Sequence, residues 1–240
     1  MAAMDGKTVL VTGGTTGIGR AIAIELARAG AKVLIFGRHK PELDDAMAAL
    51  EDTIGEAEGM IADQSKPEDI QKVFAKAKEM GGLSAVIANA GISAEGLADV
   101  SDKEWRYAME TNLLGYLDVA KRAAEALEGK KGDIILVGSV SADNRSKGTS
   151  VYTATKAGIQ GFADSFRKEM GEKNVRVSLI EPGSVGSDMQ ECTPEEQRKK
   201  IAKAEMLKAE DIAELVTFIL TRPDRCTISS VRIEERVQSE

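Results

Sequence analysis

Two side chains in the second half of the chain have the chemistry and spacing of a proton-transfer pair. Tyr152 and Lys156 are four residues apart at the start of a helical pattern, so they lie on one face of a helix. A phenol titrates near pH ~10 when unperturbed, but an ammonium group held beside it stabilises the phenolate and lowers its pKa. Such pairs are also common on helix surfaces. The position of this pair, shortly after the apolar run 133–137 and Ser139, favours a catalytic role over a surface pair.

A glycine-rich turn near the N-terminus predicts a phosphate-binding site. The apolar run 9–11 leads into a turn with Gly13, Gly17 and Gly19, and a helical pattern follows at once. The N–H groups of such a turn and the positive end of the helix dipole point at one place, and missing side chains let an anion approach. Because a strand precedes the turn and a helix follows it, we expect a dinucleotide site rather than a structural turn.

The loops after the second and third apolar runs bear on which dinucleotide binds. Gly37-Arg38-His39-Lys40 contains no acidic residue that could accept from a ribose 2′-hydroxyl, and Arg38 can make bidentate contacts with a phosphate. We therefore expect NADP(H) to be preferred, with NAD(H) possible; a solvated basic loop is the alternative. His39 is the only histidine, so no metal site is expected. Asp63 is expected either to contact adenine or only to start a loop.

Apolar runs alternate with helical stretches along the whole chain, which predicts a parallel sheet covered by helices on both faces. We expect about seven strands in a doubly wound, Rossmann-type α/β fold, with residues 1–240 as a single domain. Ligands of such sheets bind beyond the carboxyl ends of the strands. The charged segment at about 184–207 is expected to be either a solvated helix or a substrate lid.

Capping-box patterns at 65–68 and 101–104 predict two helix starts, and the second is expected to open one long helix to about Leu127. Trp105, Tyr107 and Met109 lie on that helix and are assigned to packing rather than to cofactor contacts.

Composition argues against several other classes of protein. The 240 residues carry a net charge of −7, which is unlike a general nucleic-acid binder, and no apolar run is long enough for a membrane span. Residues 1–7 lack the pattern of a signal peptide. Cys192 and Cys226 are the only cysteines. Two isolated thiols are typical of a reducing compartment, so a cytoplasmic location is expected.

Taken together, these features resemble the short-chain dehydrogenase/reductase family over essentially the whole chain. The matching motifs are Thr12-Gly13-Gly14-Thr15-Thr16-Gly17-Ile18-Gly19, Asn89-Ala90-Gly91, Thr111-Asn112, Ser139, Tyr152-x-x-x-Lys156 and Pro182-Gly183. The resemblance implies an oxidoreductase that interconverts a secondary alcohol and a ketone or aldehyde by hydride transfer. It implies that the cofactor lies on the first two motifs and on Pro182, Gly183 and Val185.

The resemblance also implies roles for the catalytic side chains. Tyr152 would be the general acid or base, and Ser139 would donate to the substrate oxygen. Lys156 would bind the nicotinamide ribose and lower the pKa of Tyr152, and Asn112 would hold a water molecule that links Lys156 to solvent. The substrate, a small molecule, is expected to contact Ile92, residues 140–145 and the lid.

Subunit association and two other functions stay open at this point. The resemblance implies a homodimer or homotetramer, but the family often ends in a Gly-Gly tail, whereas Glu234 and Glu235 follow the last apolar run here. A dinucleotide-binding regulator without turnover is one alternative function. A sugar-nucleotide epimerase or dehydratase is the other, although such enzymes usually have a larger C-terminal domain than the residues after Gly183 allow.

Overall fold

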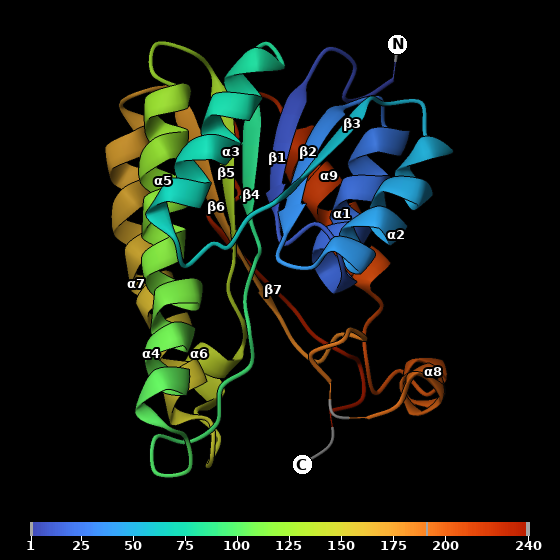
Figure 1. Ribbon diagram of the computed structural model, residues 1–240, viewed down its shortest axis with the longest axis vertical. Coiled ribbons are helices and arrows are strands. Elements are labelled where there is room, and N and C mark those ends of the chain that lie inside the picture. Colours follow the sequence, from blue (N-terminus) through green and yellow to red (C-terminus); the bar gives the residue numbers. More distant parts are fainter. Residues whose placement is uncertain (1, 191, 239–240) are drawn as a thin grey trace.

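Seven short apolar runs become the strands of one parallel sheet in the computed structural model, which describes residues 2–190 and 192–238 (Figure 1). The strand order is β3-β2-β1-β4-β5-β6-β7, so the expected doubly wound α/β fold is confirmed. The strands are β1 (Thr8–Thr12), β2 (Lys32–Gly37), β3 (Ala57–Ile61), β4 (Ala85–Ala88), β5 (Gly132–Val137), β6 (Val175–Pro182) and β7 (Ser230–Ile233).

Helices cover both faces of the sheet. Helices α1, α2 and α9 lie on one face, and α3, α5 and α7 lie on the other (Figure 1). None of the described helices is long and apolar enough to cross a membrane. The helical segments are α1 (Gly17–Arg28), α2 (Lys40–Glu51), α3 (Pro67–Glu79), α4 (Asp102–Met109), the π-helical turn η1 (Glu110–Leu114), α5 (Gly115–Ala126), α6 (Ser141–Asn144), α7 (Ser150–Gly171), α8 (Pro194–Ala202) and α9 (Ala209–Leu220).

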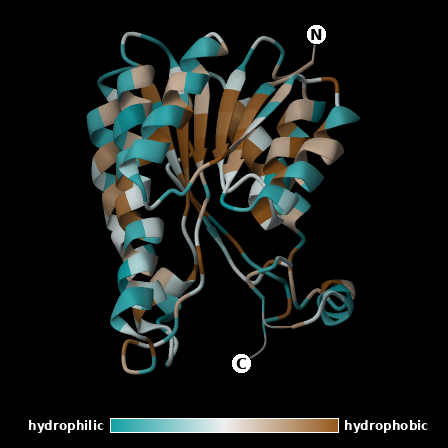
Figure 2. Ribbon diagram, viewed as in Figure 1, coloured by the Kyte–Doolittle hydropathy of each residue, from teal (hydrophilic) through white to brown (hydrophobic). Residues whose placement is uncertain are grey.

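The sheet separates two hydrophobic cores because successive side chains of a strand point to opposite faces. Leu10 of β1 belongs to the core beneath α3, α5 and α7, whereas its neighbours Val9 and Val11 belong to the core beneath α1, α2 and α9. All three are fully buried. Figure 2 shows the strands as the most hydrophobic part of the molecule. This burial on both faces explains why the inner strands read as apolar runs, whereas the edge strands β3 and β7 are partly exposed and carry charged residues.

The strand order reverses between β1 and β4. From β1 the chain continues to β2 and β3 on one side, and it then returns to place β4 on the other side of β1. Loops that leave β1 and β4 therefore diverge, which creates a crevice at the carboxyl edge of the sheet. The candidate residues Gly13 and Asn89 follow these two strands.

The helix expected from residue 101 to Leu127 is interrupted. Its start is confirmed, because the side chains of Ser101 and Glu104 form the reciprocal hydrogen bonds of a capping box. After α4, however, the backbone widens into η1 before α5 begins. The reason is tertiary: Gln64 Nε2 donates to the Thr111 carbonyl oxygen at 3.0 Å, and the Asn112 side chain bonds the backbone of Ile92.

The capping box expected at 65–68 is wrong. Helix α3 starts at Pro67 with Lys66 as its N-cap, and that N-cap makes no side-chain capping bond. The Ser65 hydroxyl instead donates to Asp63 Oδ1 at 2.8 Å, and the Ser65 amide donates to the same oxygen at 3.0 Å. The Ser65 hydroxyl is therefore bonded to the Asp63 carboxylate and does not cap helix α3.

A buried ion pair stabilises the opposite, amino-terminal edge of the sheet. The Arg176 guanidinium on β6 donates to both carboxylate oxygens of Asp133 on β5, at 2.7 and 3.0 Å. It also donates to the carbonyl oxygens of Arg222 and Cys226, at 2.9 and 3.1 Å. One side chain therefore ties two strands to the connection between α9 and β7.

Candidate active site

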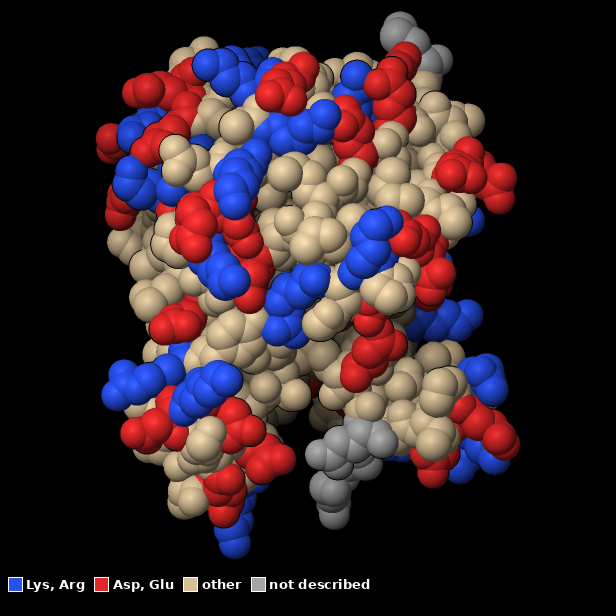
Figure 3. Space-filling view, viewed as in Figure 1, with Lys and Arg blue, Asp and Glu red and all other residues tan. Residues whose placement is uncertain are grey.

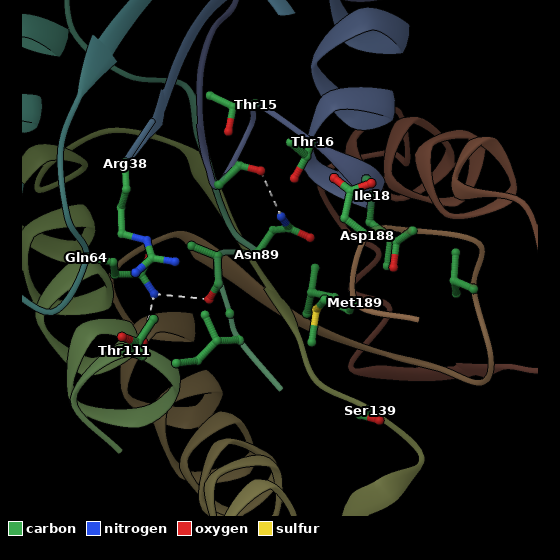
Figure 4. Close-up of a pocket in the computed structure, with 18 of the residues that line it drawn as sticks. Thr15, Thr16, Ile18, Arg38, Gln64, Asn89, Thr111, Ser139, Asp188 and Met189 are labelled. Atoms are coloured by element: carbon green, nitrogen blue, oxygen red, sulfur yellow. Dashed lines mark hydrogen bonds between the residues drawn. The ribbon is translucent and has the colours of Figure 1, made fainter. Parts of the chain in front are cut away.

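A cavity of about 380 Å³ lies at the carboxyl edge of the sheet, beside the β1–β4 crevice (Figure 4). Most of the predicted site residues line it, although they come from the ends of six different strands and from helix α7. They are Gly13, Thr15, Thr16, Gly17, Ile18, Arg38, Asp63, Asn89, Ala90, Gly91, Ser139, Tyr152, Lys156, Pro182, Gly183 and Val185. Gly19 and Asn112 do not line the cavity. Each contacts a residue that does: Gly19 lies against Gly13, and Asn112 is bonded to Ile92.

The first loop is shaped as a cradle for an anion. A Cβ atom at Gly13 would lie 2.8 Å from the Ala90 Cα, and one at Gly19 would lie 2.1 Å from the Gly13 carbonyl oxygen, so neither position accepts a side chain. Gly17 has a φ of +51°, which favours glycine. Among the described residues no side chain caps the N-terminus of α1. Its N–H groups therefore remain for a ligand phosphate, which fits a dinucleotide.

The loop after β4 is bonded directly to the end of β1. The Thr12 hydroxyl accepts from the amides of Asn89 and Ala90, at 3.0 and 2.9 Å. The Asn89 side-chain amide donates back to the Thr12 carbonyl oxygen at 3.1 Å. Gln64 Nε2 donates to the Ala90 carbonyl oxygen at 3.2 Å (Figure 4). These bonds join two strand ends into one continuous floor of the cavity.

Asn112 fixes the next residue of that loop. Its Oδ1 accepts from the Ile92 amide at 2.9 Å, and its Nδ2 donates to the Ile92 carbonyl oxygen at 2.8 Å. The side chain is fully buried in η1. Both of its polar atoms are thus used to hold Ile92, which lines the cavity. The role of Asn112 in holding a water molecule stays a prediction.

Tyr152 and Lys156 project from the first turns of α7 into the cavity. The Lys156 Nζ lies 5.6 Å from the centroid of the Tyr152 ring and 5.3 Å from that of Tyr116. It donates to the Val137 carbonyl oxygen at 3.0 Å, and the buried Tyr116 hydroxyl donates to the same oxygen at 3.0 Å. The ammonium group is therefore held at the end of β5, beneath the phenol.

The pKa values of this pair differ from the expectation. Burial lowers the pKa of Lys156 to about 8, and burial raises the pKa of Tyr152, while the Ser139 hydroxyl acts on Tyr152 in the opposite direction. The expected lowering of the Tyr152 pKa by Lys156 is thus not produced by the protein's own groups. The reason is geometric: the ammonium group lies over the ring and donates to Val137.

Ser139 is held in place by the short helix α6. Its hydroxyl donates to the Ser141 hydroxyl at 3.1 Å and accepts from the Ser141 amide at 3.1 Å. The substrate contacts expected at residues 140–145 do not line the cavity. Arg145 is exposed, has a φ of +50°, and donates to the Ala142 carbonyl oxygen at 3.3 Å. Of the substrate contacts predicted outside the lid, Ile92 and Ser139 line the cavity.

The end of the cavity near β2 contains Arg38, His39 and Glu42. Figure 4 shows Arg38 extending from the end of β2 toward Gln64 and Thr111. The Arg38 Nη1 donates to the Tyr107 hydroxyl, which itself donates to Asp63 Oδ2 at 3.0 Å. Tyr107 itself does not line the cavity, so no contact contradicts its assignment to packing rather than to cofactor contacts. Its hydroxyl is bonded to Arg38 and Asp63, which do line the cavity, and the motifs did not indicate that link.

The segment after β6 contributes a rim that the motifs did not identify. Residues 187–190 line the cavity, and Figure 4 shows Asp188 and Met189 across it from Arg38. Helix α8, in contrast, buries none of its side chains. Within the segment 184–207, residues 187–190 therefore line the cavity, whereas helix α8 is solvated.

Comparison with known proteins agrees with this geometry. A family model described as short chain dehydrogenase matches residues 7–198. The 3-oxoacyl-(acyl-carrier-protein) reductase FabG of Haemophilus influenzae is 33% identical over 223 residues, which cover 90% of this chain and 91% of that protein. The chain therefore belongs to the short-chain dehydrogenase/reductase family. It is an oxidoreductase that uses a nicotinamide dinucleotide and acts on CH–OH or C=O groups.

Two solved structures have the same fold along almost their whole length. A dehydrogenase/reductase from Sinorhizobium meliloti is 29% identical and has a TM-score of 0.86. The matched region covers 98% of this chain and 96% of that chain. A short chain dehydrogenase from Burkholderia cenocepacia, crystallised in complex with NADP, is 28% identical and also has a TM-score of 0.86. The matched region covers 97% of this chain and 98% of that chain.

Proposed function

We propose that this protein is an NADP(H)-preferring oxidoreductase that interconverts a secondary alcohol and a ketone or aldehyde, with Tyr152 as general acid and base. The observation that carries the proposal is that Tyr152, Ser139 and Lys156 line the same cavity as the glycine cradle. A regulator that only binds a dinucleotide needs the cradle but no proton donor, so this convergence favours an enzyme.

The residues suit proton transfer to a carbonyl oxygen. The nicotinamide group supplies or accepts the hydride when it is bound. Negative charge then develops on the substrate oxygen, where the Tyr152 hydroxyl gives its proton and the Ser139 hydroxyl donates a hydrogen bond. Lys156 uses one N–H on Val137, which leaves two for ribose hydroxyls.

The proposed preference for NADP(H) is supported by the charges at the β2 end of the cavity. Arg38 lies there, and no acidic residue directly follows β2. Glu42 lines the same end and would repel a 2′-phosphate, which opposes Arg38. A charged hydrogen bond contributes about 1.5–3 kcal/mol. We therefore expect a preference of roughly tenfold for NADPH over NADH.

The proposed substrate site lies between Ile92, Ser139 and the rim at 187–190. We propose that this rim is the part of the lid that contacts the substrate. Met189 is 43% exposed in that rim and offers an apolar surface at the entrance. Because FabG of Haemophilus influenzae is named a 3-oxoacyl-(acyl-carrier-protein) reductase, a 3-oxoacyl thioester is the first compound to test.

We also propose that the protein forms a homodimer or homotetramer in the cytoplasm. Leu114 and Leu117, at the end of η1 and in α5, are 57% and 38% exposed, and such neighbouring apolar side chains suit a helix-to-helix subunit contact. Cys192 and Cys226 are both free, which suits a reducing compartment. Figure 3 shows acidic and basic side chains interspersed over the visible face, without a basic patch for nucleic acid.

The test compares the wild type with Tyr152→Phe. Oxidation of NADPH and of NADH is followed against a panel of ketones, aldehydes and 3-oxoacyl thioesters, and NADPH binding is measured by fluorescence. We expect turnover to fall by at least about 100-fold in Tyr152→Phe while NADPH binding is retained. Unchanged turnover would contradict the assigned role, and equal or better use of NADH by the wild type would contradict the cofactor preference.

A further inference from the structure

A chain of two hydrogen bonds lies at the β2 end of the cavity. Arg38 follows β2, Asp63 follows β3, and Tyr107 reaches between them from α4. The Arg38 Nη1 donates to the Tyr107 hydroxyl, and that hydroxyl donates to Asp63 Oδ2 at 3.0 Å. The Arg38 guanidinium carbon also lies 5.4 Å from the centroid of the Tyr107 ring. A neutral hydroxyl thus separates a cation from an anion.

Arg38 depends on this contact for its position. It is an exposed side chain on a loop, and fixing such an arginine in one rotamer costs conformational entropy. Among the described residues, the Tyr107 hydroxyl is the only hydrogen-bond acceptor of Arg38. A guanidinium group has five N–H donors, so four remain for a ligand.

Asp63 sets the direction of the bonds. Its Oδ1 accepts from the amide and hydroxyl of Ser65, at 3.0 and 2.8 Å, which fixes the carboxylate. Its Oδ2 accepts a hydrogen bond from the Tyr107 hydroxyl, so the lone pairs of the phenol oxygen face Arg38. Burial and the neighbouring Asp63 raise the pKa of Tyr107. The phenol therefore keeps its proton at neutral pH, and the direction of both bonds is maintained.

We propose that Tyr107 is a positioning residue for dinucleotide specificity: its hydroxyl holds the Arg38 guanidinium toward a ribose 2′-phosphate and prevents a direct Arg38–Asp63 ion pair. This inference rests on the proposed NADP(H) preference. Without the hydroxyl, Arg38 either pairs with Asp63 or moves into solvent, and in both cases the attraction for a 2′-phosphate is reduced. Binding of the rest of the dinucleotide does not depend on the hydroxyl.

The experiment uses two nucleotide fragments that differ in the phosphate that Arg38 would read. Calorimetry measures the Kd of adenosine 2′,5′-bisphosphate and of 5′-AMP for the wild type, Tyr107→Phe, Asp63→Ala and Trp105→Phe. The first variant keeps the ring and removes only the hydroxyl. Trp105 lies on the same helix but bonds Asp102 and contacts Arg106, so Trp105→Phe is the matched control. The ratio of kcat/KM for NADPH to that for NADH is measured alongside.

We expect Tyr107→Phe to weaken the 2′,5′-bisphosphate roughly tenfold, to leave 5′-AMP within about twofold, and to lower the NADPH-to-NADH ratio equally. Asp63→Ala is expected to weaken both fragments, because both contain adenine. Trp105→Phe should match the wild type. An unchanged or increased preference for the bisphosphate in Tyr107→Phe would overturn the role of Tyr107. A wild type that binds both fragments equally would overturn the NADP(H) preference and this inference with it.

Discussion

The Glu235 carboxylate accepts a hydrogen bond from the Ser184 backbone amide, with 2.9 Å between Oε2 and N and 51 positions between the residues. The contact follows from the pairing of β6 and β7, which brings the chain after Ile233 alongside the turn at Gly183. Farther along, the Val237 amide donates to the Ala204 carbonyl oxygen at 2.9 Å. The tail thus contacts both ends of the segment 184–207.

Replacing Glu235 with alanine is expected to loosen the turn that follows β6. The Ser184 amide loses a charged acceptor, which at this partly exposed position contributes about 1 kcal/mol. We expect kcat/KM to fall severalfold and cleavage of 184–207 by a protease to become faster. Glu235→Gln keeps an acceptor oxygen and should behave like the wild type. Equal protease sensitivity in all three proteins would contradict this prediction.

Replacing Lys156 with methionine is expected to stabilise the fold near neutral pH, although it removes activity. Burial lowers the Lys156 pKa from 10.5 to about 8. Between those values the unfolded chain binds a proton that the folded chain has released, so wild-type stability rises with pH across that window. Below pH 8 the buried charge destabilises the fold by up to about 3 kcal/mol.

Urea unfolding at pH 7 and at pH 10 checks this expectation. Lys156→Met should have the larger free energy of unfolding at pH 7, and its advantage should shrink at pH 10, where the folded wild type holds a neutral amine. A difference between the two proteins that is the same at both pH values would argue against a lowered pKa for Lys156.

Replacing Leu114 with glutamate is expected to dissociate the proposed oligomer. Two symmetry-related carboxylates would meet in a contact that apolar side chains now make, and like charges in a desolvated contact repel. Sedimentation analysis should detect monomers at concentrations where the wild type is associated. Ile54→Glu is the control, because Ile54 is 74% exposed but follows α2, away from α5. Dissociation in both variants, or in neither, would count against this surface.

Replacing Asp133 with asparagine is expected to lower the free energy of unfolding by about 3 kcal/mol. The change leaves the Arg176 guanidinium without its counter-charge where both side chains are only about 15% exposed. The pair lies at the amino-terminal edge of the sheet, so turnover of the folded variant should match the wild type. Denaturant unfolding and steady-state kinetics measure the two effects, and a loss below about 1 kcal/mol would contradict the prediction.

The predictions from sequence that succeeded rest on local patterns. Strands buried on both faces read as apolar runs, and the residues directly after them lie at one edge because parallel strands all end there. That is why Gly13, Asn89, Ser139 and Pro182 could be placed around one cavity although they lie far apart in the chain.

The predictions that failed depend on partners distant in sequence or on competing acceptors. The π-helical turn at Asn112 requires Gln64 and Ile92, which no helical pattern near residue 112 can indicate. Ser65 was misassigned because Asp63 competes for its hydroxyl. The bonds of the Tyr107 hydroxyl could not be predicted because its partners, Arg38 and Asp63, lie 69 and 44 positions away.

The tight contact of α1 with the first loop has a kinetic and thermodynamic consequence. Because Gly19 packs directly against the Gly13 carbonyl and Gly13 packs against Ala90, the shape of the loop is set by its neighbours within the fold. An arriving dinucleotide therefore meets a surface that needs no ordering, and preorganisation of this kind removes an entropic penalty from binding. Association rates should accordingly be similar for NADPH and NADH, and any difference in their affinities should arise from their dissociation rates.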